Sequence, residues 1–509
     1  MRTVSSIKNS FIASASMIIK ILVGFFAQKI FILILDKEYL GVNGLFSNII
    51  TLLSLAELGI GQAIIFNLYK PIATDDKESI KSLMHLYKKA YNLIAVVVLV
   101  LGVLMIPFLG YFIGETTLDL NFTFVYILFL LQCVASYVFT YKRSILYAYQ
   151  ENYIISIIDS IYVLVVNIIQ LVVLYLTKNY YLYLSIKIFC VIVENLIINN
   201  IVNKKYTFIN EKNVQELDEK IKKDVFSRIK AQLLHKVGGI VVNGTDNIII
   251  SKFIGLATVG LYSNYYMIIY SVSEIIKQLI NSLIPSVGNL LVEESKEKSF
   301  DIYKKIVFLN FWISTFSSIA ILVIVQSFME LWMGKEYLLS LFVVIVLVMN
   351  FYLKTMRTTN DVFLIAAGIC VETKFVPIVE AILNIIFSII LIKPFGLAGV
   401  FIGTFISSFP LWCYSYPKFG YKKTLGGKYK DYIKENLVYL ALFITIATVT
   451  YGLSMTFAIS NLWIDVIARG VLCLIVPNLI LFLIYRKSDE FEYFKNLLKF
   501  MLERKNKEG

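Results

Sequence analysis

The sequence predicts an all-α, polytopic membrane protein of about 14 transmembrane helices, and three observations carry this prediction. Hydrophobic residues make up 58% of the 509 residues, and the mean hydropathy is +0.75. A soluble interior of this size cannot bury that much apolar surface. The apolar residues form runs of about 20, the length that a helix needs to cross a bilayer core. Lysine and arginine lie between alternate runs, as they do in cytoplasmic loops.

The apolar runs form two sets of six, followed by a pair. The first set is expected near residues 9–35, 41–69, 83–113, 119–141, 154–177 and 180–202. The second set is expected near 228–250, 256–291, 306–329, 338–366, 371–392 and 396–417, and the pair near 435–458 and 463–485. Each run predicts one membrane-spanning helix.

The charged loops predict the orientation. Lys and Arg gather in segments such as 70–89, 204–224 and 418–434, each of which follows an even-numbered helix. Because basic residues collect in cytoplasmic loops, these segments and both termini are expected on the cytoplasmic side of the cell membrane. The net charge of +13 then reflects topology and an anionic inner leaflet rather than a nucleic-acid partner.

The sequence gives no support for metal or cofactor chemistry. The five cysteines lie singly within apolar runs, without the paired spacing of a zinc site, so no metal and no cofactor is expected. The first apolar run is too long for a cleavable signal and contains Lys20 and Lys29. It is therefore expected to form the first spanning helix.

An internal duplication organises the chain. Gly44-Leu45-Phe46-Ser47-Asn48 reappears as Gly260-Leu261-Tyr262-Ser263-Asn264, and Tyr87-Lys88-Lys89 reappears as Tyr303-Lys304-Lys305. Both pairs are separated by 216 residues (260 − 44 and 303 − 87). This offset covers an even number of helices, so it predicts a parallel repeat about a pseudo-two-fold axis along the membrane normal.

The repeat predicts a domain plan. The N-terminal lobe is expected over 1–202, a cytoplasmic linker over 203–225 and the C-terminal lobe over 226–420, with the last two helices and a cytoplasmic tail over 421–509. Two similar lobes suit alternating access to a site between them. The alternative is that the repeat records only how the fold arose.

Two lysines are related by the same offset. Lys20 in the first helix corresponds to Lys236 in the seventh (20 + 216), and each is expected roughly 12–18 Å from the cytoplasmic end of its helix. A lysine at that depth is too costly to face lipid. The pair predicts a binding site for an anion. The alternative is that each lysine pairs with a carboxylate such as Glu57 or Asp246.

Further polar residues gather on helices one, two, seven and eight and predict a wet cavity there. They are Lys29, Asn48, Glu57, Gln62, His235, Asn243, Asp246, Asn247, Glu274 and Lys277. Coupling to H⁺ or Na⁺ would need a carboxylate, and Asp246, Glu57 and Glu274 are the candidates, among which the sequence does not choose. The alternative for Glu274 is a local pair with Lys277 on one helix face.

Two arginines lie near the cytoplasmic ends of helices four and ten. Arg143 and Arg357 could guide an anionic headgroup inward, or could anchor their helices by snorkelling. The sequence favours neither role over the other.

Three motifs resemble a known family. They are Leu40-Gly41-Val42-Asn43-Gly44-Leu45-Phe46-Ser47-Asn48, Thr245-Asp246-Asn247-Ile248-Ile249-Ile250-Ser251, and Pro377-x-x-Glu380-x-x-x-Asn384 running into 396–404. With the fourteen-helix plan, the chain resembles the polysaccharide transporter branch of the multidrug/oligosaccharidyl-lipid/polysaccharide (MOP) flippase superfamily, which includes the Wzx-type oligosaccharide flippases. The resemblance covers essentially the whole chain.

The resemblance implies two six-helix lobes in a V shape, with cavity charges that hold an anionic lipid headgroup. It implies export of undecaprenyl-pyrophosphate-linked repeat units for capsule, O-antigen or exopolysaccharide, with membrane lipids and polysaccharide polymerase machinery as further partners. The basic positions carried over as substrate-binding residues are Lys20 and Lys236, together with Lys29 and Arg357.

Two other function classes compete with this interpretation. A membrane glycosyltransferase or polymerase would be expected to expose a sizeable domain with acid and base residues, whereas the inferred outward loops are short and the chain has two histidines. A multidrug or cation exporter of the same superfamily would share the lobes, but its site should favour carboxylates over lysines.

Overall fold

The computed structural model describes residues 2–57, 60–114, 116–211, 241, 244–369, 372–373, 375–457 and 459–508. Across these ranges the chain forms helices joined by short turns and contains no strand. The predicted all-α class is confirmed. The chain divides into two compact units, Met1–Ser263 and Asn264–Gly509.

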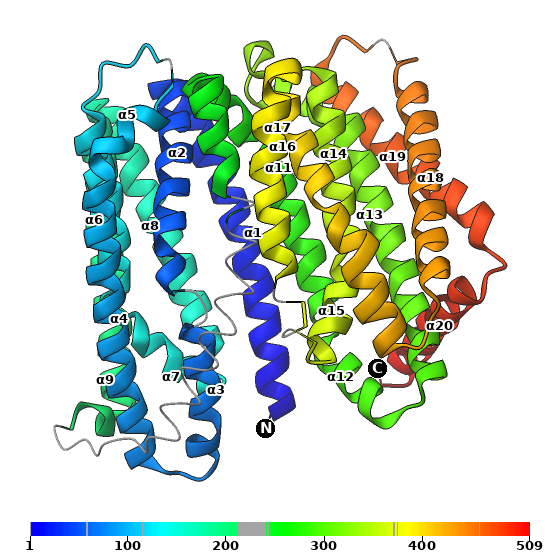
Figure 1. Ribbon diagram of the computed structural model, residues 1–509, viewed down its shortest axis with the longest axis horizontal. Helices are drawn as coiled ribbons and strands as arrows, with labels where there is room; N and C mark the ends of the chain where they lie inside the picture. The colour runs from blue at the N-terminus through cyan, green and yellow to red at the C-terminus, as the bar shows by residue number, and fades with distance from the viewer. Residues whose placement is uncertain are drawn as a thin grey trace. The chain divides into compact units, whose positions relative to one another are not determined.

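The first unit begins with a long helix and continues as an up-and-down series (Figure 1). Its helices are α1 Arg2–Leu35, α2 Lys37–Leu53, α3 Ile60–Ala73, α4 Lys77–Met105, α5 Leu109–Phe112, α6 Phe122–Tyr137, α7 Arg143–Ala148, α8 Asn152–Thr177 and α9 Tyr180–Lys205. Short 3₁₀ turns lie at Ser54–Glu57, Ile106–Phe108, Thr140–Lys142 and Thr207–Asn210. α11 Leu256–Asn281 begins in this unit and ends in the second.

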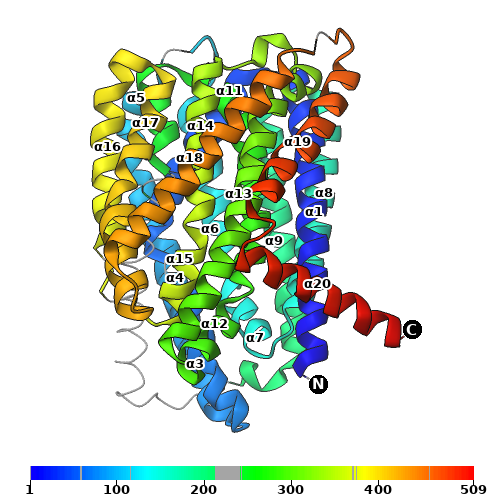
Figure 2. The ribbon, with the colours of Figure 1, turned by 90° about the vertical axis from the view of Figure 1, so that its right-hand side faces the viewer.

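The second unit repeats the up-and-down arrangement and adds helices at its C-terminal end (Figure 2). Its helices are α12 Ile284–Glu293, α13 Lys296–Trp332, α14 Leu341–Met356, α15 Thr358–Ala366, α16 Val376–Phe395, α17 Leu397–Ser407, α18 Tyr429–Ser454, α19 Leu462–Tyr485 and α20 Asp489–Glu508. A 3₁₀ turn lies at Lys335–Tyr337 and a π-helix at Leu411–Thr424.

Twelve helices within the described residues are long and apolar enough to cross a membrane, against fourteen predicted. Each of the twelve coincides with a predicted run. The predicted run 41–69 is not one helix, because α2 has 17 residues and gives way to a 3₁₀ turn at Ser54–Glu57. The run 228–250 lies largely outside the described residues. Large apolar side chains such as Phe26, Leu176 and Phe189 stay exposed, as lipid contact requires.

The fourth predicted helix is broken between α6 and α7. Phe139 has a φ of 63°, which turns the chain out of the helix after Tyr137. The amide of Asn195 on α9 donates to the carbonyls of Ala135 and Ser136, each at 3.2 Å, so the freed carbonyls stay hydrogen-bonded. Because these carbonyls are hydrogen-bonded, the helix can be interrupted here within a membrane-spanning segment.

The tenth predicted helix has a milder interruption at one residue, Arg357, whose backbone stays in the helical region with a φ of −69° and a ψ of −17°. Arg357 separates α14 from α15, and the buried Asn310 on α13 donates to the carbonyls of Thr355 and Met356 at 2.9 and 3.1 Å. Tyr141, within the first break, and Arg357, in the second, stand 216 residues apart (357 − 141). The helix breaks therefore follow the same offset as the sequence repeat.

Asn195→Leu tests the cap at the first break. The substitution removes one of the two donors of each carbonyl, because Ala135 also accepts from the Val138 N–H and Ser136 from the Thr140 hydroxyl, so we expect the free energy of unfolding to fall by about 0.5–1.5 kcal/mol. Thermal unfolding in detergent measures the loss. Asn200→Leu, the same change at an exposed position of α9, is the matched control. Equal stability of the two variants would show that the cap contributes nothing.

Glycines let α2 and the start of α11 approach with their backbones in contact. A Cβ added at Gly41 would overlap the carbonyl oxygen of Leu256, and one at Gly260 would overlap that of Lys37. A Cβ at Gly44 would lie 3.3 Å from the hydroxyl oxygen of Ser263. Gly44 and Gly260 are the repeat-related glycines of the sequence. They lie at one crossing, at the ends of α2 and α11 that are predicted to face outward.

Candidate functional site

Four charged side chains meet inside the first unit, one from each of four helices. The Lys20 ammonium on α1 lies 3.5 Å from the Asp159 carboxylate on α8. Arg143, the first residue of α7, lies 2.8 Å from Asp159 and 3.0 Å from Glu194 on α9. Arg143 thus bridges two carboxylates, and Asp159 is shared between two cations. We refer to Lys20, Arg143, Asp159 and Glu194 as the charge network.

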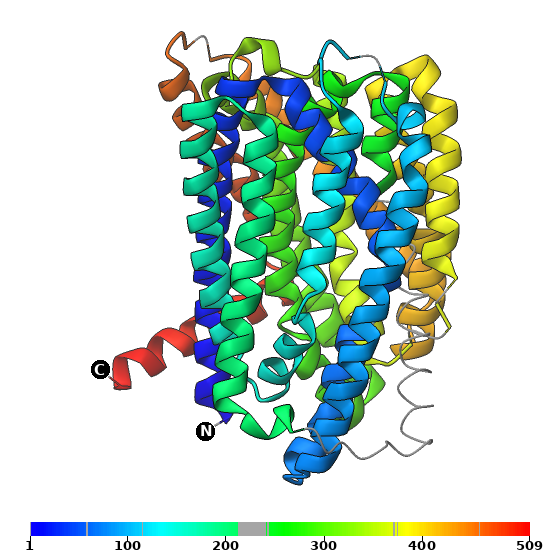
Figure 3. The same ribbon diagram turned by 90° about the vertical axis from the view of Figure 1, so that its left-hand side faces the viewer.

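Local structure fixes each member of the charge network. One turn before Lys20, the Ser16 hydroxyl donates to the carbonyl of Ser156 at 3.1 Å and also contacts the Ser160 hydroxyl, which sets α1 against α8. The break after α6 lets Arg143 begin a new helix. Figure 3 shows α1 running beside α8, and α9 packs against α8.

The charge network is graded in exposure. The side chains of Glu194 and Arg143 are 10% and 20% exposed, whereas those of Asp159 and Lys20 are 29% and 36% exposed. Two cations and two anions make the network neutral. Burying these charges is tolerable because each has a partner within 3.5 Å. Lys20 is the open member, and its long contact to Asp159 leaves N–H donors for another anion.

Two further lysines of this unit lie in spanning helices. Lys187 lies on α9 seven residues from Glu194, so both occupy the same helix face about 10.5 Å apart. Lys29 lies nine residues from Lys20 on α1, on the opposite face of that helix. Within the part of the chain that the structure describes, Lys29 and Lys187 are half-buried and have no ion pair. The predicted Lys20 and Lys29 therefore do not share a surface.

The second unit holds a separate ion pair at its own helix break. The Arg357 guanidinium lies 2.9 Å from the Glu380 carboxylate on α16, whose side chain is 7% exposed. Close by, the Tyr416 hydroxyl donates to Asp361 at 2.8 Å. Arg143 and Arg357 thus both join a helix break to a carboxylate on the next spanning helix. This pairing links the two helices and neutralises both arginines.

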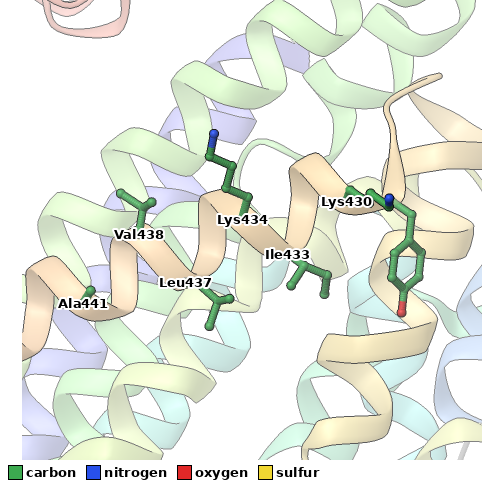
Figure 4. A pocket seen from close by; sticks show the side chains of 7 residues that line it. Lys430, Ile433, Lys434, Leu437, Val438 and Ala441 are labelled. Atoms are coloured by element: carbon green, nitrogen blue, oxygen red, sulfur yellow. The ribbon is translucent and has the colours of Figure 1, made fainter.

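A shallow groove of about 540 Å³ runs along α18 in the second unit (Figure 4). Its floor is apolar, and Lys430 and Lys434 lie toward the helix start. All of its lining residues belong to α18: Tyr429, Lys430, Ile433, Lys434, Leu437, Val438 and Ala441. It contains no carboxylate and takes no part in the charge network.

Comparison with known proteins identifies the family. Residues 6–291 match the model of a family described as polysaccharide biosynthesis protein. The chain belongs to this family. No curated protein sequence matches the chain.

Solved structures of low sequence identity share the fold of this polysaccharide biosynthesis protein. The lipid II flippase MurJ, in an inward closed conformation, is 12% identical over 94% of this chain and 99% of MurJ, with a TM-score of 0.67. An inward-facing multidrug resistance MATE family transporter of the MOP superfamily is 14% identical over 78% of this chain and 94% of that one, with a TM-score of 0.60. The Vibrio cholerae MATE transporter VcmN, in a mutant form, is 15% identical over 82% and 98% of the two chains, with a TM-score of 0.54. The chain therefore shares the fold of these transporters and of MurJ.

The predicted coupling carboxylates of this polysaccharide biosynthesis protein lie in different surroundings. Glu57 occupies the 3₁₀ turn that ends α2, where the Ser54 hydroxyl contacts the Cys133 thiol at 3.3 Å. Asp246 is buried, and its neighbour Asn247 packs against Gly44 on α2. These two carboxylates thus lie along the second predicted helix.

Glu274 forms the alternative contact named from the sequence. Its carboxylate lies 3.4 Å from the Lys277 ammonium, three residues along α11. A pair within one turn is partly exposed and locally neutral. The predicted Lys236, His235 and Asn243 lie outside the described residues. In the described ranges, no group of three or more His, Cys, Asp or Glu residues is placed to hold a metal ion.

Two charged residues of these helices, Asp159 and Lys187, were not predicted as site residues from the sequence. Lys20 pairs with Asp159 rather than with Glu57 or Asp246. Glu194 and Arg143 were not linked to each other. Asp159 is the single charged residue of α8, inside an apolar run, and that isolation is a signal that could have marked it.

Proposed function

We propose that this polysaccharide biosynthesis protein is a flippase. Its proposed cargo is an undecaprenyl-pyrophosphate-linked oligosaccharide, carried across the cytoplasmic membrane for capsule, O-antigen or exopolysaccharide synthesis. Membership of the family and the shared fold support a transporter rather than an enzyme. The neighbour described as a lipid II flippase supports a lipid-linked cargo.

The excess of cations on four neighbouring helices of the first unit is the observation that carries the proposal. In the spanning parts of α1, α7, α8 and α9, four cations face two anions: Lys20, Lys29, Arg143 and Lys187 against Asp159 and Glu194. Intramembrane charges are costly, so an unbalanced set requires a ligand or a water-filled space. A pyrophosphate diester, with a negative charge on each phosphate, matches that excess.

The geometry suggests how Lys20 takes part. When an anionic headgroup approaches, Lys20 can leave its 3.5 Å contact with Asp159 and bind a phosphate oxygen. Asp159 then remains paired with Arg143, which lies 2.8 Å away, so its charge stays compensated. The exchange lets Lys20 bind and release the headgroup at low cost. Lys187, two turns from Glu194, could contact the second phosphate.

Alternating access is the transport mechanism that we infer for the lobes 1–202 and 226–420. The α2–α11 crossing at Gly41, Gly44 and Gly260 would form the closed outward side, and it must separate to release cargo outward. The segments 203–225 and 421–509 would lie at the cytoplasmic side as linker and C-terminal region. Coupling to H⁺ or Na⁺ through Asp246, Glu57 or Glu274 belongs to the same proposal.

A second candidate function is export of a cationic drug. The structural likeness to a MATE family transporter favours it. The cations of α1, α7 and α9 oppose it, because a cationic cargo beside Lys20 would be repelled by that lysine and by Arg143, whose two carboxylates are already paired. Exchange of a cationic dye in proteoliposomes distinguishes the two functions.

Lys20→Ala should abolish most of the flipping. The assay follows leaflet accessibility of a fluorescent undecaprenyl-pyrophosphate-linked oligosaccharide in proteoliposomes with matched protein incorporation. Losing a charge-assisted hydrogen bond of roughly 1.5–3 kcal/mol predicts a roughly ten- to hundredfold slower rate. Lys236→Ala is expected to behave alike, because it is the repeat-related lysine.

Lys89→Ala, at an exposed position of α4, is the matched control and should flip at the wild-type rate. If Lys20→Ala flips lipid as fast as Lys89→Ala, the protein is still a flippase but Lys20 has no role in binding the cargo. If the wild type flips none of several glycans but exchanges the cationic dye, the cargo proposal is wrong.

A further inference from the structure

The C-terminal helix α20 is amphipathic and was expected from the sequence only as a tail. It follows α19, the last spanning helix, after the three residues 486–488. Its first turn holds Asp489, Glu490 and Glu492, which suit the positive end of the helix dipole. The helix therefore begins close to the point where the chain leaves the bilayer.

The first turns of α20 are anchored on the bundle. The Phe491 ring stacks on Trp312 of α13, with centroids 5.9 Å apart, and meets Phe482 of α19 at 5.6 Å. The Lys305 ammonium lies over the Tyr493 ring at 4.4 Å. Beyond this anchor, Figures 2 and 3 both show α20 extending away from α13 and α19, across rather than along them.

One face of α20 is apolar, and it is half-buried at Phe491 and Phe494 and exposed at Leu497. Phe491, Phe494 and Leu497 recur every three residues, and the sequence continues the pattern with Leu498 and Met501. Leu497 is 40% exposed, so the bundle leaves this face open at that position. An exposed apolar helix face of this kind is typical of a surface that another protein or a membrane covers.

The charges of α20 indicate the occupant. Residues 495–507 contain five basic residues and one acidic residue, a net charge of +4: Lys495, Lys499, Arg504, Lys505 and Lys507 against Glu503. Helices that lie in a membrane interface combine an apolar face with a basic polar face. Anionic lipid headgroups attract such a face. The apolar face also starts beside Phe482, at the end of a spanning helix, so lipid is already adjacent.

We propose that α20 lies in the headgroup region of the inner leaflet. Its apolar face contacts the acyl chains, and its basic residues bind anionic phospholipid. The placement requires only that α19 spans the membrane with its C-terminal end in the cytoplasm, and it does not depend on the cargo. The charge excess favours lipid over a protein partner, because anionic lipid surrounds the helix wherever it lies.

The test uses the full-length protein with its native cysteines replaced. An environment-sensitive fluorophore is attached to Leu497→Cys, on the apolar face, and in a separate sample to Asn496→Cys, its exposed neighbour on the polar face. Proteoliposomes contain phosphatidylethanolamine with or without phosphatidylglycerol. Nitroxide-labelled lipid reports contact with the bilayer, and iodide reports contact with water.

We expect nitroxide lipid to quench the label at 497 but not at 496, and phosphatidylglycerol to strengthen that difference. Each basic residue near an anionic surface contributes roughly a fivefold factor in partitioning, so Lys495→Glu with Lys499→Glu should weaken it by more than about tenfold. High salt should weaken it as well. Hydrogen exchange of 495–508 in nanodiscs provides the same comparison without any substitution.

Three outcomes would overturn the proposal. Equal iodide quenching at 497 and 496 in both lipids would place the helix in water. If the label at 497 is protected from iodide equally with and without phosphatidylglycerol, and also in the charge-reversal variant, the apolar face is covered by another part of the protein. Protection that arises only when a cytosolic protein is added would assign the face to that partner.

Discussion

Arg143→Met is expected to cost the folded protein about 3–5 kcal/mol, because removing one partner of a buried ion pair leaves the other charge uncompensated. Here the substitution strands Glu194, which lies 3.0 Å from Arg143, and leaves Asp159 with Lys20 as its one ion-pair partner at 3.5 Å. Glu194 has a side chain only 10% exposed and cannot turn to water. Thermal unfolding in detergent and the monodisperse fraction after extraction measure the effect.

The matched control neutralises the network as a whole. A variant that combines Arg143→Met with Asp159→Asn and Glu194→Gln has no stranded carboxylate, so it should recover most of the lost stability. It leaves Lys20 without its partner at the open side, where water or a headgroup can reach it. If the triple variant is as unstable as Arg143→Met, the arginine acts by packing and not by charge.

Arg143 also shows which part of the site could be predicted from sequence. Its position near the cytoplasmic end of an apolar run could be predicted from the sequence. The sequence also suggested two alternative roles, guiding an anionic headgroup or anchoring the helix. Its partners could not be read, because Asp159 and Glu194 come from two other helices, and pairing depends on how α7, α8 and α9 pack. Helical periodicity predicts a face within one helix but not the helix that faces it.

The helix breaks account for most of the difference between the predicted and observed spans. The chain leaves α6 at Phe139, where no Pro or Gly marks the break in the sequence. The break is instead stabilised by Asn195, which lies on α9 and is far away in the sequence. At Ser54–Glu57 the apolar pattern continues while the backbone changes to a 3₁₀ turn. Hydropathy reports the length of an apolar segment and is insensitive to its continuity.

The repeat relates two glycines that the structure brings together. The offset of 216 residues paired Gly44 with Gly260, and close helix approach is a common role for glycine in membranes. The structure places both at the crossing of α2 and α11, where the Cβ of any larger residue at Gly260 would overlap the Lys37 carbonyl. What the sequence could not supply is that the two related segments meet each other.

A disulfide across this crossing is expected to arrest flipping. A Cβ at position 44 would lie 3.3 Å from the Ser263 hydroxyl oxygen, which is compatible with the Cβ–Cβ separation of about 3.5–4.5 Å in a disulfide. Gly44→Cys with Ser263→Cys, in a chain lacking its native cysteines, should therefore cross-link under mild oxidation. If the outward ends must separate in each cycle, the oxidised protein should lose nearly all lipid flipping, and a reductant should restore it.

The two single variants carry the controls, because oxidant without a second cysteine should leave their flipping unchanged. Each also measures the cost of its own substitution, which matters at Gly44, where an added Cβ would lie 3.0 Å from Val259. Complete cross-linking with undiminished flipping would show that α2 and α11 stay together throughout transport. The outward path would then have to open between other helices, since a covalent bond at this crossing forbids its separation.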